Sequence, residues 1–112
     1  MVRLHIEGCV DCTSLPVVGK LPLLKVLFIR CMHIVKNIGH EFNGKGCSQP
    51  FRFLETLHFE DMHEWENWIA CEEFPQLRKL SLTGCPKLVG KLPNRLPLLE
   101  EIVMNGCQQL VV

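Results

Sequence analysis

Two segments of the chain approach motifs that bind metals or phosphates, and each lacks a residue that the chemistry requires. His63-Glu-Trp-Glu-Asn67 begins like H-E-x-x-H, in which two imidazoles one helical turn apart hold zinc, but Asn67 replaces the second histidine. The segment from Gly39 to Gly46 resembles a phosphate-binding loop. Gly46 follows its lysine, where a hydroxyl is needed to hold magnesium. We therefore predict neither a zinc site nor a nucleotide site here.

The cysteines offer one further candidate, the pair Cys9-x-x-Cys12, which has the spacing of half a zinc site or of a redox pair. Cys31 and His33 are further potential ligands, but the sequence has no second C-x-x-C. Because Cys9 and Cys12 fall on core positions of the repeat described below, we expect buried structural thiols. The five histidines suggest no Ser-His-acid set. We predict a protein with no catalytic site and no cofactor or metal.

Composition limits the classes of partner that the chain is expected to bind and the cellular compartment in which it is expected to lie. The net charge is zero, whereas nucleic acids and anionic membranes select basic surfaces. The sequence contains no apolar run of roughly 18 residues that would suggest a membrane span. Seven cysteines, an odd number, without an N-terminal signal peptide favour a reducing compartment. We expect a cytoplasmic chain whose partner is a protein.

Apolar residues recur at fixed offsets from five anchor positions. The anchors, spaced by 23, 30, 23 and 22 residues, are Leu4, Leu27, Leu57, Leu80 and Ile102. The residues two after them are Ile6, Ile29, Phe59, Leu82 and Met104, and those five after them are Cys9, Met32, Met62, Cys85 and Cys107. The positions three before and eight after each anchor are also apolar or cysteine. This periodicity indicates stacked repeats that share one core.

The offsets predict the structure of each unit. The anchor and the residue two after it lie on one side of a short strand, because side chains alternate along a strand. The chain then turns, and the residue five after the anchor returns beneath the strand. We expect little helix between strands, and extended chain at Pro22, Pro75 and Pro97, five residues before their anchors. Stacking of such units builds a parallel sheet along one face.

These offsets predict one repeat domain over residues 1–112. The predicted units are 1–20, 21–48, 51–73, 74–95 and 96–112. The extra length of the second unit falls in residues 39–50, which are rich in Gly, Asn, Ser and Pro, and we expect an exposed loop there.

Three runs of the sequence, 21–42, 51–68 and 74–93, are similar to repeats of plant intracellular immune receptors. The most specific parts are Met62-x-x-Trp65-x-x-Trp68 and the run Cys-Pro-Lys-Leu-x-Gly-x-Leu-Pro that begins at Cys85. Nearly the whole chain resembles the C-terminal leucine-rich-repeat region of coiled-coil-type nucleotide-binding disease-resistance proteins.

This resemblance implies an α/β leucine-rich-repeat horseshoe, with a concave parallel sheet and an irregular, helix-poor convex side. It also implies recognition of pathogen effectors or host targets, and autoinhibitory contacts with the receptor's own nucleotide-binding module. Because that module is not among these residues, we expect a fragment of a longer chain or a truncated product. The alternative is an F-box-type repeat protein, which selects substrates for ubiquitin ligation. The 30-residue repeat and the tryptophan segment favour the immune receptor.

Polar residues beside the predicted strands give the candidate contact residues on the concave face. Residues two before the anchors and three after them are expected to point away from the core, where they form ladders of opposite charge. The residues directly after the anchors add a row that contains aromatic side chains. The candidates are His5, Lys25, Phe28, Arg30, Glu55, His58, Glu60 and Arg78. The charges either pair with one another in solvent or form a mixed-charge docking surface for a protein. Phe28 with His5 and His58 is the predicted contact patch.

Overall fold

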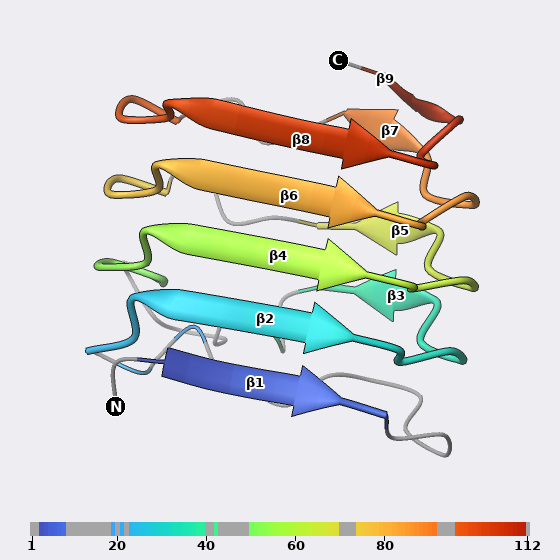
Figure 1. Cartoon of the computed structure of the whole chain (residues 1–112), viewed down its shortest axis with the longest axis horizontal. Helices are drawn as coiled ribbons and strands as arrows, with labels where there is room; N and C mark the ends of the chain where they lie inside the picture. Colours follow the sequence, from blue (N-terminus) through green and yellow to red (C-terminus); the bar gives the residue numbers. More distant parts are fainter. Residues whose placement is uncertain are drawn as a thin grey trace.

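The main element of the computed structural model is a five-stranded parallel sheet (Figure 1). The structure describes residues 3–8, 19, 21, 23–39, 42, 50–69, 74–91 and 96–111. In spatial order the strands are β1 (Arg3–Glu7), β2 (Val26–Arg30), β4 (Thr56–Glu60), β6 (Lys79–Thr83) and β8 (Glu101–Asn105). Each strand pairs in parallel with the next one in this order, so the order of the strands in the sheet is their order along the chain.

The register of this sheet aligns the predicted anchors. Leu4 lies opposite Leu27, Leu27 opposite Leu57, Leu57 opposite Leu80, and Leu80 opposite Ile102. The residues two after the anchors are aligned in the same way. The predicted strands and their register are therefore confirmed.

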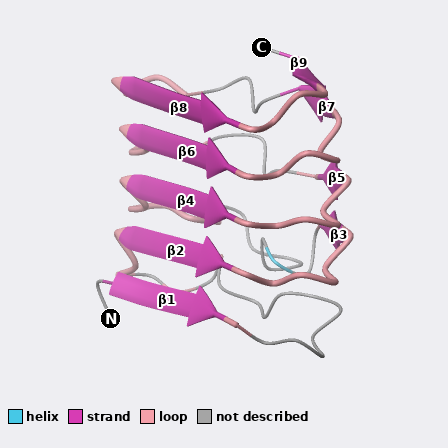
Figure 2. Cartoon of the chain, turned by 45° about the vertical axis from the view of Figure 1, so that its right-hand side comes forward, coloured by secondary structure: helices cyan, strands magenta, loops and turns pink. Residues whose placement is uncertain are grey.

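A second layer of two-residue strands lies behind the sheet (Figure 2). Here β3 (Asn37–Ile38) pairs with β5 (Asn67–Trp68), and β7 (Gly90–Lys91) pairs with β9 (Leu110–Val111). The predicted scarcity of helix is confirmed, since Phe42 alone among the described residues is helical. Over the same residues, no helix is long and apolar enough to cross a membrane.

The core lies between these two layers and follows the predicted offsets. Leu54 and Leu77, three before their anchors, and Val35, Trp65 and Leu88, eight after theirs, are fully buried. A further core column stands six residues before the anchors and was not predicted. Its members are Leu21, Phe51, Phe74 and Leu96. The Phe51 and Phe74 rings stack with their centroids 5.6 Å apart, so this column joins neighbouring repeats through the core.

Two sequence expectations are wrong. The loop predicted at 39–50 is not wholly exposed, because Phe42 is only 2% exposed and its ring lies 5.1 Å from that of Phe51. Pro75 and Pro97 lie in tight turns and not in extended chain. The Leu77 and Leu99 amides donate to the carbonyls three residues earlier, which places each proline at the second position of a turn, where its fixed φ fits. Cys9, Cys12, Pro22 and most of the predicted loop lie outside the described residues.

The turn that follows each strand contains a residue in the left-handed region. This residue stands four after the anchor, with φ of 71° at Gly8, 56° at Cys31, 54° at Asp61, 66° at Gly84 and 70° at Gly106. Its amide continues the sheet ladder: Cys31 N donates to Glu60 O (3.0 Å), and Asp61 N donates to Thr83 O (2.9 Å). The next residue is thereby directed under the sheet. Met32, Met62 and Cys85 are buried there as predicted, and Cys107 is half-buried.

Candidate protein-interaction surface

The side of the sheet away from the core, here called the outer face, carries a row of rings in contact with one another. The row consists of the residues directly after three anchors, His5, Phe28 and His58, which the register places side by side. The rings are tilted to one another, by 53° for His5 and Phe28 and by 61°, an edge contact, for Phe28 and His58. The ring centroids are 5.1 Å apart for His5 and Phe28 and 5.4 Å apart for Phe28 and His58. The structure thus brings together the predicted patch, with Phe28 half-buried between two imidazoles. We call these residues the His–Phe row.

Charged side chains on the same face form a short network beside this row. Arg30 Nε donates to Glu60 Oε2 (2.8 Å), and Arg30 Nη1 lies 3.8 Å from Glu7 Oε1. His58 Nε2 lies 3.1 Å from Glu60 Oε1, so an N–H at that atom donates to the carboxylate. The hydrogen bond from His58, followed by the charge of Arg30, lowers the pKa of the Glu60 carboxyl. Glu60 in turn raises the pKa of Arg30. The network fixes the side chains that border Phe28.

Lys25, Glu55 and Arg78 were predicted to lie on the outer face, but they lie outside the strands. They precede the strands by one residue and lie between the turn and the first strand residue. Position two before an anchor has the anchor's own parity, so a regular strand would direct it inward; the regular strand has not begun at this point. Arg78 Nη1 pairs with Glu100 Oε2, at the equivalent position of the next repeat, at 2.6 Å.

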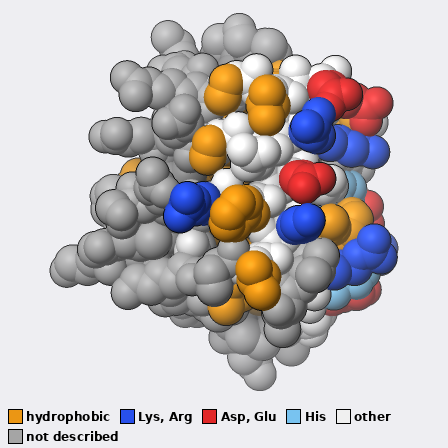
Figure 3. Space-filling model, turned by 90° about the vertical axis from the view of Figure 1, so that its left-hand side faces the viewer, with side chains coloured by type: hydrophobic (Ala, Val, Ile, Leu, Met, Phe, Trp, Pro, Cys, Tyr) orange, Lys and Arg blue, Asp and Glu red, His pale blue; other side chains and the backbone are white. Residues whose placement is uncertain are grey.

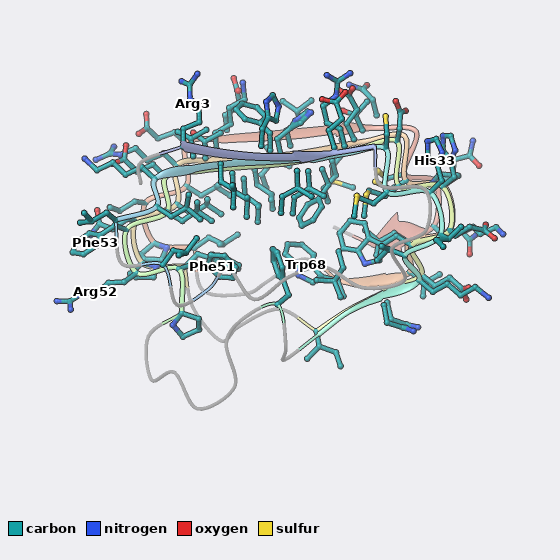
Figure 4. All side chains as sticks on the ribbon, turned by 90° about the horizontal axis from the view of Figure 1, so that it is seen from below. Arg3, His33, Phe51, Arg52, Phe53 and Trp68 are labelled. Carbon is teal, nitrogen blue, oxygen red and sulfur yellow. The ribbon has the colours of Figure 1, made fainter. Side chains whose placement is uncertain are left out.

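Sequence reasoning missed the residues that directly precede the anchors, which are the first residues of the strands. On the outer face this row contains Arg3, Val26, Thr56, Lys79 and Glu101. Lys79 Nζ lies 3.2 Å from Glu101 Oε2. Figure 4 shows Arg3 projecting from the sheet on the side opposite to Phe51 and Trp68. The alternation of strand side chains was the signal that identifies this row.

The titratable residues of the turns after the strands do not assemble a metal site in the described parts of the chain. His33 and His63 stack with their centroids 4.9 Å apart, and His63 Nε2 lies 3.9 Å from Asp61 Oδ1. The His63–Asn67 segment is a turn that runs into β5, and Trp65 at its centre is fully buried, so the two-ligand helix of a zinc motif is not formed.

The described cysteines Cys31, Cys85 and Cys107 are free thiols. Burial, followed by the neighbouring Cys107, raises the pKa of the Cys85 thiol to about 12. A thiol with this pKa stays protonated at neutral pH, and the thiolate is the reactive form of cysteine. Cys85 therefore acts as a core residue.

The sequence of the chain is similar to two known proteins. The chain is 37% identical, over an alignment of 118 positions, to the disease resistance RPP13-like protein 1 of Arabidopsis thaliana, and the alignment covers 96% of the chain and 11% of that protein. It is 38% identical over an alignment of 111 positions to a second Arabidopsis thaliana disease resistance protein, covering 91% of the chain and 8% of the relative. These matches confirm the resemblance to plant disease-resistance proteins.

The chain spans about a tenth of the length of these two disease-resistance relatives. Neither relative carries an F-box name, so the alternative of a ubiquitin-ligase subunit gains no support from them. No protein-family model matches the chain, and no solved structure matches it.

Proposed function

We propose that the chain is a protein-recognition and scaffold module of a plant intracellular immune receptor. It acts in defense by binding a pathogen effector or a host target, and by autoinhibitory contact with the receptor's own nucleotide-binding module. The relatives named for disease resistance support the defense role. The module is cytoplasmic, and it has no catalytic role and needs no cofactor.

In this proposal the stacked units continue into a horseshoe, with the outer face as its concave side. The five units follow the repeat boundaries set by the anchors. The parallel sheet and the aligned anchors support this arrangement. A continuous sheet presents many neighbouring side chains to one partner, which suits recognition of a folded protein surface.

The observation that carries the proposal is the His–Phe row. Phe28 is an aromatic side chain on the outer face, where it fills no part of the core. Aromatic residues and arginine are enriched in protein interfaces, whereas most charged residues lie at the solvent-accessible margin of the interface. Arg30, Glu60 and Glu7 border Phe28 in this way. A partner that covers Phe28 would therefore meet an aromatic centre with a charged margin.

The test is co-immunoprecipitation from plant cells. The chain is expressed together with the nucleotide-binding module of its receptor, with and without the matching effector. Phe28→Ser should abolish one of these associations. Ile34→Ser, which replaces an exposed apolar side chain elsewhere on the surface, should leave both unchanged. If the two variants behave alike, or if no association is seen, the proposed role of the outer face is wrong.

A further inference from the structure

A row of exposed apolar side chains runs along the turns that lead into the strands. The side chains four residues before the anchors are exposed to 60% at Leu23, 40% at Phe53 and 38% at Leu98, and Gln76 occupies the same position between Phe53 and Leu98. On this side of the molecule, hydrophobic side chains form a band next to charged ones (Figure 3). We call Leu23, Phe53 and Leu98 the apolar stripe.

The backbone holds the apolar stripe at the spacing of the sheet. Next to it, Glu55 N donates to Lys25 O (2.7 Å), Arg78 N to Glu55 O (2.8 Å), and Glu100 N to Arg78 O (2.8 Å). The turns at Phe53, Gln76 and Leu98 are also closed internally, as by Leu54 N to Phe51 O (3.2 Å). Neighbouring members of this column are therefore about 4.8 Å apart, the distance between adjacent strands. The backbone that carries the stripe is therefore held in place before a ligand binds.

This spacing matches one face of an α-helix. A helix rises 1.5 Å per residue, so positions i, i+3, i+7 and i+10 lie at about 0, 4.5, 10.5 and 15 Å along its axis and share one face. Starting from Leu23, the strand spacing places Phe53, Gln76 and Leu98 at about 4.8, 9.6 and 14.4 Å. An extended peptide repeats its side chains on one face every ~6.7 Å and would lose this match.

Positive charge beside the apolar stripe sets the chemistry of the ligand. The Arg52 guanidinium lies 5.2 Å from the centroid of the Phe53 ring, and Figure 4 shows both side chains projecting away from the core side chain of Phe51. Arg78 is neutralised by Glu100 (2.6 Å). The charge of Lys25 is offset by Glu55 at the equivalent position of the next repeat. Arg52 forms no ion pair with any described carboxylate, so it supplies the uncompensated positive charge. An arginine stacked on an aromatic ring still directs its N–H groups outward, where they fit a carboxylate.

We infer that the apolar stripe binds an amphipathic helix of a partner protein. Apolar side chains at i, i+3 and i+10 of that helix contact the stripe, the side chain at i+7 lies over Gln76, and a carboxylate on the flank of the helix pairs with Arg52. The inference rests on the proposed role in protein recognition, but it uses a surface separate from the His–Phe row.

The experiment uses a synthetic helical peptide with leucine at i, i+3, i+7 and i+10 and glutamate on both flanks, titrated with the chain and followed by fluorescence anisotropy. Phe53→Ser should weaken binding roughly tenfold, equivalent to about 1.4 kcal/mol. Arg52→Glu should weaken binding of this peptide and strengthen binding of the same peptide with lysine on its flanks. Val89→Ser removes an exposed apolar side chain outside the stripe and should bind like the wild type. A peptide with the same composition but reordered leucines should bind roughly tenfold more weakly.

Equal binding by Phe53→Ser and wild type, or no binding of the peptide, would overturn the inference. Sedimentation that shows dimers lost in Phe53→Ser would assign the stripe to a second copy of the chain, and binding to phosphatidylserine vesicles that requires Phe53 would assign it to a membrane. Either result contradicts the helix. Phe28→Ser should still bind the peptide, so failure of this inference is separable from failure of the proposed function. The exposed positions of these substitutions allow an unchanged thermal melt to serve as the check on folding.

Discussion

The two faces of the five-stranded sheet obey one register but differ in how strictly their residue types repeat. On the inner face the anchors and the residues two after them are all Leu, Ile, Phe or Met, and Leu57 and Phe59 in the middle are fully buried. On the outer face, one row changes from His and Phe to Ser81 and Val103. Close packing constrains the first set, because a void or a polar atom there is costly. The second set is free to vary, which makes the outer face suited to recognition.

A charge placed inside would have the largest effect. Cys85 is fully buried beneath the sheet, so Cys85→Asp should lower the free energy of unfolding by about 3–5 kcal/mol, because the carboxylate would have no partner there. Urea unfolding followed by circular dichroism measures the loss. Cys85→Ala is the control and should cost far less. If both variants lose the same amount, the position does not require an apolar side chain.

Removing a phenyl ring from each face tests the comparison directly. Phe59→Ala on the inner face should cost about 3–5 kcal/mol, since it leaves a cavity among fully buried neighbours. Phe28→Ala on the outer face should cost at most about 2 kcal/mol, because its two cross-strand ring contacts, with His5 and His58, contribute up to about 1 kcal/mol each. The same unfolding measurement applies to both. Comparable losses would show that Phe28 is also a packing residue and would weaken its assignment to recognition.

The turns after the strands allow a matched pair of smaller changes. Gly8 and Gly84 have nearly equal φ angles, but a Cβ at Gly8 would meet nothing within 4 Å, whereas one at Gly84 would lie 2.8 Å from Asp61 Oδ1. Gly8→Ala should therefore cost about 1–2 kcal/mol, the backbone penalty alone. Gly84→Ala should cost more, and thermal melting measures the difference. Equal losses would mean that Asp61 moves aside freely.

The smallest effect concerns protonation on the outer face. Because the pKa of Glu60 is lowered in the folded state, its contribution to stability is present at pH above about 4.5 and is lost as the pH falls through the folded value. His58→Ala removes the hydrogen-bond donor that is the first cause of this shift, so the pKa of Glu60 should rise. Nuclear magnetic resonance titration of the Glu60 carboxyl measures the pKa, with His63→Ala as the control. An unchanged pKa in His58→Ala would exclude His58 as the cause.

The residues of the inner face were predictable because close packing restricts these positions to apolar residue types. Each repeat must fill the same space, so the anchors Leu27, Leu57 and Leu80 and the turn residue Met62 can be read from their spacing alone. The core column six residues before the anchors had the same signal, since all four of its members are apolar. Phe42 had no such signal. It stands in a polar stretch, and only the shape of the surrounding core shows that a ring fits there.

The sequence by itself determined the repeat, the register of the strands and the identity of most core residues, because burial penalises every misplaced polar group in every unit. Only the tertiary structure decided where each strand begins, and therefore that Lys25, Glu55 and Arg78 lie outside the strands while Lys79 lies on the outer face. It also decided which charges pair and which apolar side chains remain uncovered. These outcomes depend on distances between atoms far apart along the chain. Exposed positions also accept many residue types at small energetic cost, so the sequence records them only weakly.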